Sequence, residues 1–188
     1  EIAFSLNQSK IMKRILVTGG LGYIGSHLCR IEEAGYHPIV VDNLRNSELR
    51  QNRPLKKSHA NPLSSMSWMQ RILQVAEKIG PIDGTIHFAA LKSVSESIQK
   101  PIEYYTENLV TFGIIEYHQQ TVPKVLLFSS ATVYGETKEE CVTKDTSVGT
   151  PLNPYGRTKS LGEQMLKAGK HPIKAILLRY FNPVVKAH

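Results

Sequence analysis

The chain has 188 residues, of which 41% are hydrophobic and 21% are charged, and these values are typical of one folded domain with a single core. No apolar run approaches the roughly 20 residues of a membrane-spanning helix, so a membrane location is not expected. The formal net charge is +7, and much of it lies between Arg45 and Lys57. No aromatic residue is interleaved with this basic run, so a solvated loop is favoured and nucleic acid is not an expected partner.

The predicted elements alternate along the chain. Residues 1–12 are expected to form a disordered extension, and the domain to span 13–188. Strand patterns occupy 13–18, 37–42, 85–90, 124–130 and 174–181, whereas helical patterns follow the first strand as far as Ala34, fill 65–80 and 155–168, and lie around 102–120. Segment 43–64 is irregular and lacks a convincing pattern for the third strand expected there. The alternation predicts an α/β fold with a parallel sheet covered on both faces.

The segment TGGLGYIGSH, residues 18–27, follows the first strand and opens the first helix. The glycines that satisfy G-x-x-G-x-x-G are Gly19, Gly22 and Gly25. Glycines at this spacing allow a tight turn and a close approach to a pyrophosphate, although a tight turn alone would also use them. Asp42 ends the second strand, where a carboxylate accepts hydrogen bonds from an adenosine ribose and repels a 2′-phosphate. The combination predicts NAD over NADP, with Arg45 as a nearby feature in favour of NADP.

Tyr155 and Lys159 lie four residues apart in NPYGRTK and therefore share one face of the predicted helix. Lowering the pKa of a phenol from about 10 to about 7 requires roughly 4 kcal/mol. An ammonium about 5 Å away supplies on the order of 3 kcal/mol, and a positive nicotinamide ring could supply the rest. Such a tyrosine can take a proton from a substrate hydroxyl while hydride leaves the same carbon for a cofactor. The alternative is a surface tyrosine beside a solvated lysine.

Ser130 ends the strand KVLLFSS, and a hydroxyl at that end of a parallel strand faces the ligand crevice. We expect it to hydrogen-bond the reacting oxygen and to relay its proton to Tyr155. Ser129 is the competing candidate, because side chains alternate along a strand and only one of the two serines can face the crevice. The two cysteines, Cys29 and Cys141, and the seven histidines show no metal spacing, so no metal is expected and a reduced, cytoplasmic setting is favoured.

Six segments in the same order resemble the UDP-glucose 4-epimerase family, a branch of the extended short-chain dehydrogenases/reductases. They are TGGLGYIGSH (18–27), VVDNLRNS (40–47), HFAALKSVSESIQKPIEYYTEN (87–108), SSATVYGE (129–136), TPLNPYGRTK (150–159) and LLRYFNPV (177–184). The resemblance implies a Rossmann-type, doubly wound sheet that binds NAD.

The resemblance also implies roles for individual residues. The catalytic residues would be Ser130, Tyr155 and Lys159. The residues around the pyrophosphate and the adenosine would be Gly19, Gly22, Tyr23, Ile24, Gly25, Asp42, Asn43, Asn46 and Ser47. Those along the rest of the cofactor would be Phe88, Ala89, Ala90, Lys92, Asn108, Tyr155, Lys159, Tyr180 and Phe181. Those at the UDP-sugar substrate would be Lys92, Ser130, Tyr155 and Asn182.

The implied reaction interconverts UDP-glucose and UDP-galactose. Tyr155 would deprotonate the 4-hydroxyl, hydride would pass to NAD⁺, and the 4-keto sugar would turn over before hydride returns to its other face. A nucleotide-sugar 4,6-dehydratase is the rival on the same fold, but that family has acidic residues where this chain has Ala131 and Thr132. A homodimer through helices near 94–119 and 154–169 is also implied.

Three features depart from the family pattern. No aspartate occurs from Asn43 through Pro81, where the family has one at the adenine edge. Thr111 and Phe112 stand where the family has a Gly-Thr pair. The sequence ends at FNPVVKAH, before the C-terminal region that supplies most of the UDP-binding residues. We therefore expect this sequence to lack the substrate domain. The alternative function is a truncated, non-catalytic NAD-binding module or interaction subunit. The sugar specificity is left open.

Overall fold

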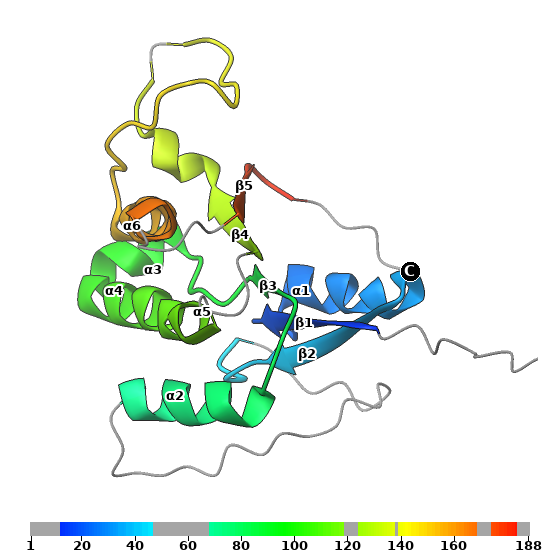
Figure 1. Cartoon of the computed structure of the whole chain (residues 1–188). Helices are drawn as coiled ribbons and strands as arrows, with labels where there is room; N and C mark the ends of the chain where they lie inside the picture. Colours follow the sequence, from blue (N-terminus) through cyan, green and yellow to red (C-terminus); the bar gives the residue numbers. More distant parts are fainter. Residues whose placement is uncertain (1–11, 47–67, 119–123, 138, 169–173, 184–188) are drawn as a thin grey trace, which may run out of the picture.

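The computed structural model describes residues 12–46, 68–118, 124–137, 139–168 and 174–183 (Figure 1). Its strands are β1 (Lys13–Thr18), β2 (Tyr36–Val41), β3 (Gly84–His87), β4 (Lys124–Ser130) and β5 (Lys174–Tyr180). Its α-helices are α1 (Tyr23–Leu28), α2 (Trp68–Ile79), α3 (Val94–Gln99), α4 (Pro101–Val110), α5 (Phe112–His118) and α6 (Pro154–Ala168). Two short 3₁₀ helices, η1 (Cys29–Ala34) and η2 (Ala131–Tyr134), complete the described elements.

The strands form one parallel sheet in the order β2-β1-β3-β4-β5. The strand order reverses between β1 and β3, because the chain leaves β1 toward β2 on one side and later returns to β3 on the other. In an open parallel sheet, ligands bind outside the carboxyl ends of the strands at such a switch point. The predicted Rossmann-type, doubly wound fold is confirmed.

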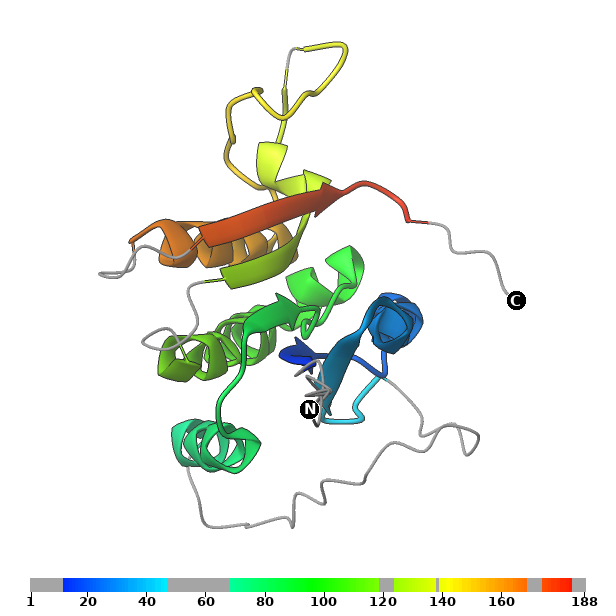
Figure 2. The same cartoon turned by 45° about the vertical axis from the view of Figure 1, so that its right-hand side comes forward.

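Helices lie on both faces of the sheet (Figures 1 and 2). Helices α2, α4, α5 and α6 cover one face, and α1 with η1 covers part of the other. Alternate strand residues point into the first layer, so Leu16 packs against Ile72 and Ile79 of α2 and Ile114 of α5. A second cluster joins Val125 and Leu127 of β4 to α5 and α6. The core therefore lies on the side of the sheet that also carries Tyr155 and Lys159.

Most predicted elements lie where the sequence indicated, and the differences have local causes. The strand expected at 85–90 is observed at Gly84–His87, and its pairing with β1 ends where β1 ends, at Thr18. The helix expected through Ala34 divides into α1 and η1, and Gly35 ends it in the left-handed conformation with φ of 81°. The helical stretch around 102–120 is interrupted at Thr111, whose hydroxyl donates to the carbonyl of Asn108 at 3.2 Å.

The bulky residue at position 112 is accommodated by a gap on α6. The Phe112 ring lies 4.9 Å from the His87 ring, centre to centre. It also faces Gly162, where an added Cβ would come within 2.5 Å of Phe112 Cζ. The departure from the family pattern at Phe112 is thus compatible with close packing of α5 against α6.

Several expectations fall partly outside the described residues. These are the extension at 1–12, of which only Met12 is described, the segment 43–64, of which 43–46 is described and irregular, and Ser47. Within the described ranges, none of the helices has the length and apolar character needed to cross a bilayer.

Candidate active site and cofactor site

The glycine turn after β1 is a crowded piece of backbone that only glycine fits. Gly19 has a φ of 67°, and a Cβ there would lie 2.7 Å from the backbone nitrogen of Ala89. At Gly25, a Cβ would lie 2.5 Å from the carbonyl oxygen of Gly19. The backbone of this turn is therefore bare and closely packed at the switch point, which is the shape that a pyrophosphate requires.

The carboxylate of Asp42 is fixed beside this turn. It accepts hydrogen bonds from the backbone nitrogens of Leu21 at 3.0 Å and Leu44 at 2.9 Å. Arg45 does not compete for this position, because its guanidinium pairs with Glu103 of α4 and lies 3.7 Å from Glu107. The Arg45 side chain, which favoured NADP in the sequence, therefore forms its ion pairs with carboxylates of α4.

Asn108 connects the loop after β3 to the helix that carries Tyr155. Its side-chain oxygen accepts from the nitrogen of Leu91 at 2.7 Å, and its amide donates to the Leu91 carbonyl at 3.1 Å and to the hydroxyl of Thr158 at 2.9 Å. Thr158 in turn donates to the carbonyl of Tyr155 at 2.7 Å. Asn108 is buried, and it therefore fixes the predicted cofactor loop against α6.

Helix α6 starts at Pro154, one residue before the start that the sequence predicted at Tyr155. The side chain of Asn153 accepts a 2.8 Å hydrogen bond from the nitrogen of Gly156, and Pro154 is the first helical residue. Lys159 lies one turn further on, is 8% exposed, and donates from Nζ to the carbonyl of Phe128 at 2.9 Å. Its Nζ is 6.0 Å from the centre of the Tyr155 ring. The pair predicted from spacing therefore exists in space.

Burial shifts the pKa of both members of this pair. Burial lowers the pKa of Lys159 to about 8. Burial also raises the pKa of Tyr155, and a hydrogen bond with the Ser130 side chain opposes that rise. Desolvation of the phenolate thus opposes the decrease in the Tyr155 pKa that we expect from Lys159 and the nicotinamide ring together, and that decrease stays a prediction.

The two serines at the end of β4 face opposite ways. The hydroxyl of Ser129 donates to Glu163 at 2.6 Å. Ser130 accepts from the nitrogen of Thr132 at 3.2 Å and from its hydroxyl at 3.0 Å. The choice of Ser130 over Ser129 as the neighbour of Tyr155 is consistent with this alternation.

Four more of the predicted residues lie along the same edge, namely Phe88, Tyr180, Lys92 and Tyr23. The Phe128 ring is stacked with that of Tyr180 at 5.1 Å and lies 3.9 Å from that of Phe88, so aromatic residues from three neighbouring strand ends meet. Lys92 Nζ lies 5.8 Å from the centre of the Tyr23 ring. Phe181 and Asn182 are exposed. Among the described residues, neither of them makes a hydrogen bond, an ion pair or a ring contact with this edge.

Comparisons with known proteins agree with this geometry. The sequence profile of the "NAD dependent epimerase/dehydratase family" matches residues 15–186. The chain belongs to this family. It is 44% identical over 184 residues to UDP-glucose 4-epimerase 2 of Arabidopsis thaliana and 39% identical over 183 residues to the UDP-glucose 4-epimerase of Yersinia pestis. These alignments cover 92% and 90% of this chain, and 52% and 53% of the relatives.

Solved structures of the family are also similar. The UDP-glucose 4-epimerase of Bifidobacterium longum, in complex with NAD⁺ and UDP, superposes with a TM-score of 0.78 at 37% identity over 91% of this chain and 54% of that one. The enzyme of Brucella ovis, in complex with NAD, gives 0.76 at 33% identity over 90% and 52%. The chain thus spans about half the length of the relatives that it matches.

One group of residues at this edge was missed in the sequence. Glu163 of α6 is buried and accepts from Arg179 of β5, from Nε at 2.9 Å and from Nη2 at 2.7 Å. The pKa of Glu163 is lowered, since these hydrogen bonds and that of Ser129 outweigh its burial. Arg179 also donates to the hydroxyl of Tyr134 at 3.1 Å. Glu163 lies one turn beyond Lys159, so the spacing argument that paired Tyr155 with Lys159 could have been extended to it.

Proposed function

We propose that this chain is the NAD-binding and catalytic part of a UDP-glucose 4-epimerase. The observation that carries the proposal is the convergence of Ser130, Tyr155 and Lys159 at the sheet edge that also holds the glycine turn. The three residues come from β4 and α6, whereas the turn and Asp42 come from β1 and β2. Family membership and the similarity to epimerases solved with NAD support the assignment.

The protein groups at this edge suit a nicotinamide cofactor. The bare turn around Gly19 would receive the pyrophosphate, Asp42 the adenosine ribose, and the loop at Phe88 to Lys92 the middle of the molecule. The pairing of Arg45 with α4 leaves Asp42 to repel a 2′-phosphate, which favours NAD over NADP. When bound, NAD⁺ supplies a hydride acceptor and a positive charge close to the Tyr155 phenol.

Tyr155 is the residue that would move the proton. A phenolate at Tyr155 would take the proton of the sugar 4-hydroxyl as hydride leaves carbon 4, and would return it when hydride is delivered to the other face. The pKa of Lys159 is lowered to about 8, so at neutral pH its ammonium would still hold positive charge beside the phenolate. Ser130, hydrogen-bonded to Tyr155, would orient the reacting oxygen.

The proposal is tested in two separate assays on the purified chain. Calorimetric titration with NAD⁺ measures cofactor binding, and conversion of UDP-galactose to UDP-glucose measures turnover. We expect NAD⁺ binding in the wild type and in Tyr155→Phe, with turnover lost in the variant. Absence of NAD⁺ binding would contradict the cofactor assignment.

A non-catalytic NAD-binding module is the second candidate, since the glycine turn and Asp42 lie apart from Tyr155 in the sequence and could bind NAD without it. It predicts NAD⁺ binding with no turnover in the wild type. The same two assays therefore distinguish the candidates, since only the catalytic one makes turnover depend on Tyr155.

We further propose that α4 and α6 form a homodimer interface. The two helices pack side by side, and they present apolar side chains outward. Ile102 is 78% exposed, and Leu161 and Met165 are 37% and 45% exposed. Sedimentation equilibrium tests this: Ile102→Glu with Met165→Glu should leave a monomer, and a dimer that persists would contradict the interface.

A further inference from the structure

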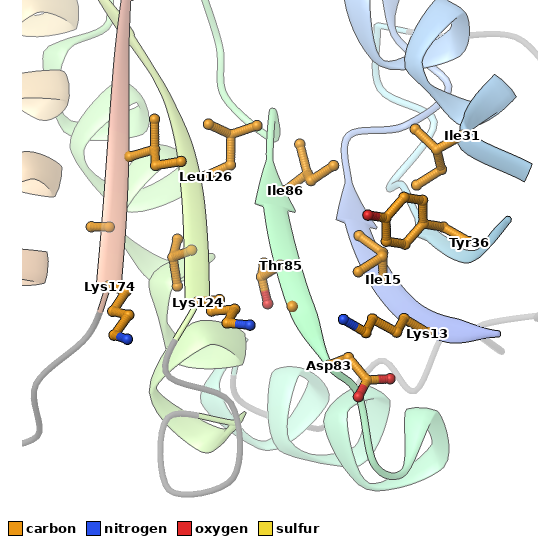
Figure 3. A pocket seen from close by; sticks show the side chains of 14 residues that line it. Lys13, Ile15, Ile31, Tyr36, Asp83, Thr85, Ile86, Lys124, Leu126 and Lys174 are labelled. Carbon is orange, nitrogen blue, oxygen red and sulfur yellow. The ribbon is translucent and has the colours of Figure 1, made fainter. Parts of the chain in front are cut away.

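Ser130 and Thr132 meet at the point where β4 ends and η2 begins. Ser130 lies four residues beyond Leu126, which lines the pocket shown in Figure 3, and side chains alternate along a strand, so these two point to the same side of β4. Ser129 points to the opposite side, where it donates to Glu163. Ser130 is 7% exposed, so the partners of its hydroxyl decide what that hydroxyl can do.

The hydrogen-bonding capacity of Ser130 is largely used by one neighbour. A serine hydroxyl has one proton to donate and two lone pairs with which to accept. The backbone nitrogen of Thr132 donates to Ser130 Oγ at 3.2 Å, and this bond caps η2. The hydroxyl of Thr132 donates to the same oxygen at 3.0 Å. Both lone pairs are thus occupied, and the proton of Ser130 is left for the Tyr155 side chain, with which Ser130 is hydrogen-bonded.

The Thr132 side chain is held against α6, next to Tyr155. A Cβ added at Gly156 would lie 3.1 Å from Thr132 Oγ1 and 3.2 Å from Thr132 Cβ, so these atoms pack on bare helix backbone. A β-branched side chain is stiff about its first torsion angle, and Thr132 makes this contact with its branch point. Its hydroxyl therefore keeps the direction in which it donates to Ser130.

We propose that Thr132 is a positioning residue, whose hydroxyl fills the second lone pair of Ser130 and so directs the single proton of Ser130 toward the oxygen of Tyr155. This inference rests on the proposed function, because it assigns the direction of a hydrogen bond within the proposed catalytic group. Ser130 is then a donor that stabilises the Tyr155 phenolate. A proton relay through Ser130 would need a lone pair open to the sugar hydroxyl, and Thr132 occupies that lone pair. The sugar proton therefore passes directly to Tyr155.

The direction of this hydrogen bond determines the sign of a measurable shift. A phenolate can only accept, whereas a neutral phenol also donates. Without the hydroxyl of Thr132, Ser130 gains a lone pair that accepts from the neutral phenol, so the pKa of Tyr155 should increase. If Ser130 instead donated its proton to Thr132, the same removal would release that proton to the phenolate, and the pKa of Tyr155 would decrease.

The test measures the pKa of the phenol at position 155 in the full chain. A difluorinated tyrosine is introduced at this position alone, where its electron-withdrawing fluorines bring ionisation to a pH at which the chain stays folded, and fluorine NMR follows the titration. Thr132→Val keeps the shape and the backbone cap but removes the hydroxyl, and it should raise this pKa by about one unit. Thr132→Ser restores the hydroxyl and should return the pKa close to that of the parent chain.

Two controls separate this role from a merely structural one. Thr111→Val removes a hydroxyl that donates to the Asn108 carbonyl, from a threonine that is also half-buried, and it should leave the pKa unchanged. In a Ser130→Ala background, Thr132→Val should no longer shift the pKa, since Thr132 acts only through Ser130. Circular dichroism confirms folding, and Thr132→Ala removes the same hydroxyl in case the valine variant does not fold. An unchanged or lowered pKa in Thr132→Val, or an equal rise without Ser130, would overturn the proposal.

The titration requires neither turnover nor NAD⁺. A wild type without turnover would therefore count against the proposed function alone, and a Tyr155 pKa that does not respond to Thr132 would count against this inference alone. Where the wild type converts UDP-galactose, Thr132→Val should lower kcat at neutral pH by about tenfold and change KM by less than about twofold, because one pKa unit leaves tenfold less phenolate. A loss confined to KM would contradict the positioning role.

Discussion

The ammonium of Lys159 donates a 2.9 Å hydrogen bond to the backbone carbonyl of Phe128, two residues before Ser130. This bond joins α6 to β4 from within the buried layer, and it fixes the lysine with its nitrogen 6.0 Å from the Tyr155 ring centre. Lys159 therefore has two roles that must be separated by experiment, one in holding the two elements together and one in placing charge beside the phenol.

The burial of Lys159 predicts an unusual dependence of stability on pH. Its pKa is about 8 in the folded chain against 10.5 ordinarily, so between these values the unfolded chain binds more protons. Between pH 8 and 10.5, the free energy of unfolding should therefore increase with pH by up to about 1.4 kcal/mol per pH unit. Below pH 8 this contribution of Lys159 no longer changes with pH. Urea unfolding from pH 7.5 to 9.5 measures this as the difference between wild type and Lys159→Met. Parallel curves for the two proteins would contradict the lowered pKa.

Removing the charge of Glu163 should destabilise the fold. Glu163→Gln leaves the Arg179 guanidinium without its carboxylate in a partly buried site, and we expect a loss of about 3 kcal/mol in the free energy of unfolding. Glu103→Gln is the matched control, because its partner Arg45 is more exposed and keeps Glu107 nearby. That variant should lose less than about 1 kcal/mol. Equal losses in urea unfolding would show that the burial of the Glu163 pair is not decisive.

A comparison of two glycines with similar backbone angles distinguishes the cost of backbone strain from the cost of steric crowding. Gly19 and Gly35 have φ of 67° and 81°, so alanine at either should cost about 1 kcal/mol. Only Gly19 faces backbone atoms, whereas a Cβ at Gly35 meets nothing within 4 Å. Gly19→Ala should therefore cost clearly more and abolish NAD⁺ binding, while Gly35→Ala retains it. Thermal unfolding and calorimetry check both results, and retained binding in Gly19→Ala would contradict the role of the turn.

The contact between Asn108 and Thr158 should appear as a coupling energy. Asn108→Ala removes three hydrogen bonds in a buried site and should cost about 2–4 kcal/mol. Thr158→Val removes one of them, so the double variant should be more stable than additivity predicts by about 1 kcal/mol. Additive losses in urea unfolding would mean that the loop and α6 are not linked through this bond.

The sequence predicted the regular parts of the fold because they depend on local patterns. The bounds of β1 and β4 and the start of α6 follow from apolar runs and from the Asn-Pro pair at 153–154. Contacts between residues far apart in the sequence could not be predicted in this way. Asn108 was assigned to the cofactor, but its position between Leu91 and Thr158 depends on residues 17 and 50 positions away. The burial that raises the Tyr155 pKa was not predicted either, because burial is a property of the assembled layers.

The contact of Phe112 with Gly162 couples the residue types that these two positions can accept. A larger residue at 162 collides with the ring, and a smaller residue at 112 leaves a hollow beside Gly162. Either single replacement is therefore penalised, whereas a matched pair of replacements can restore the packing of α5 against α6. Substitutions at 112 and 162 should consequently be inherited as a pair among descendants of this chain.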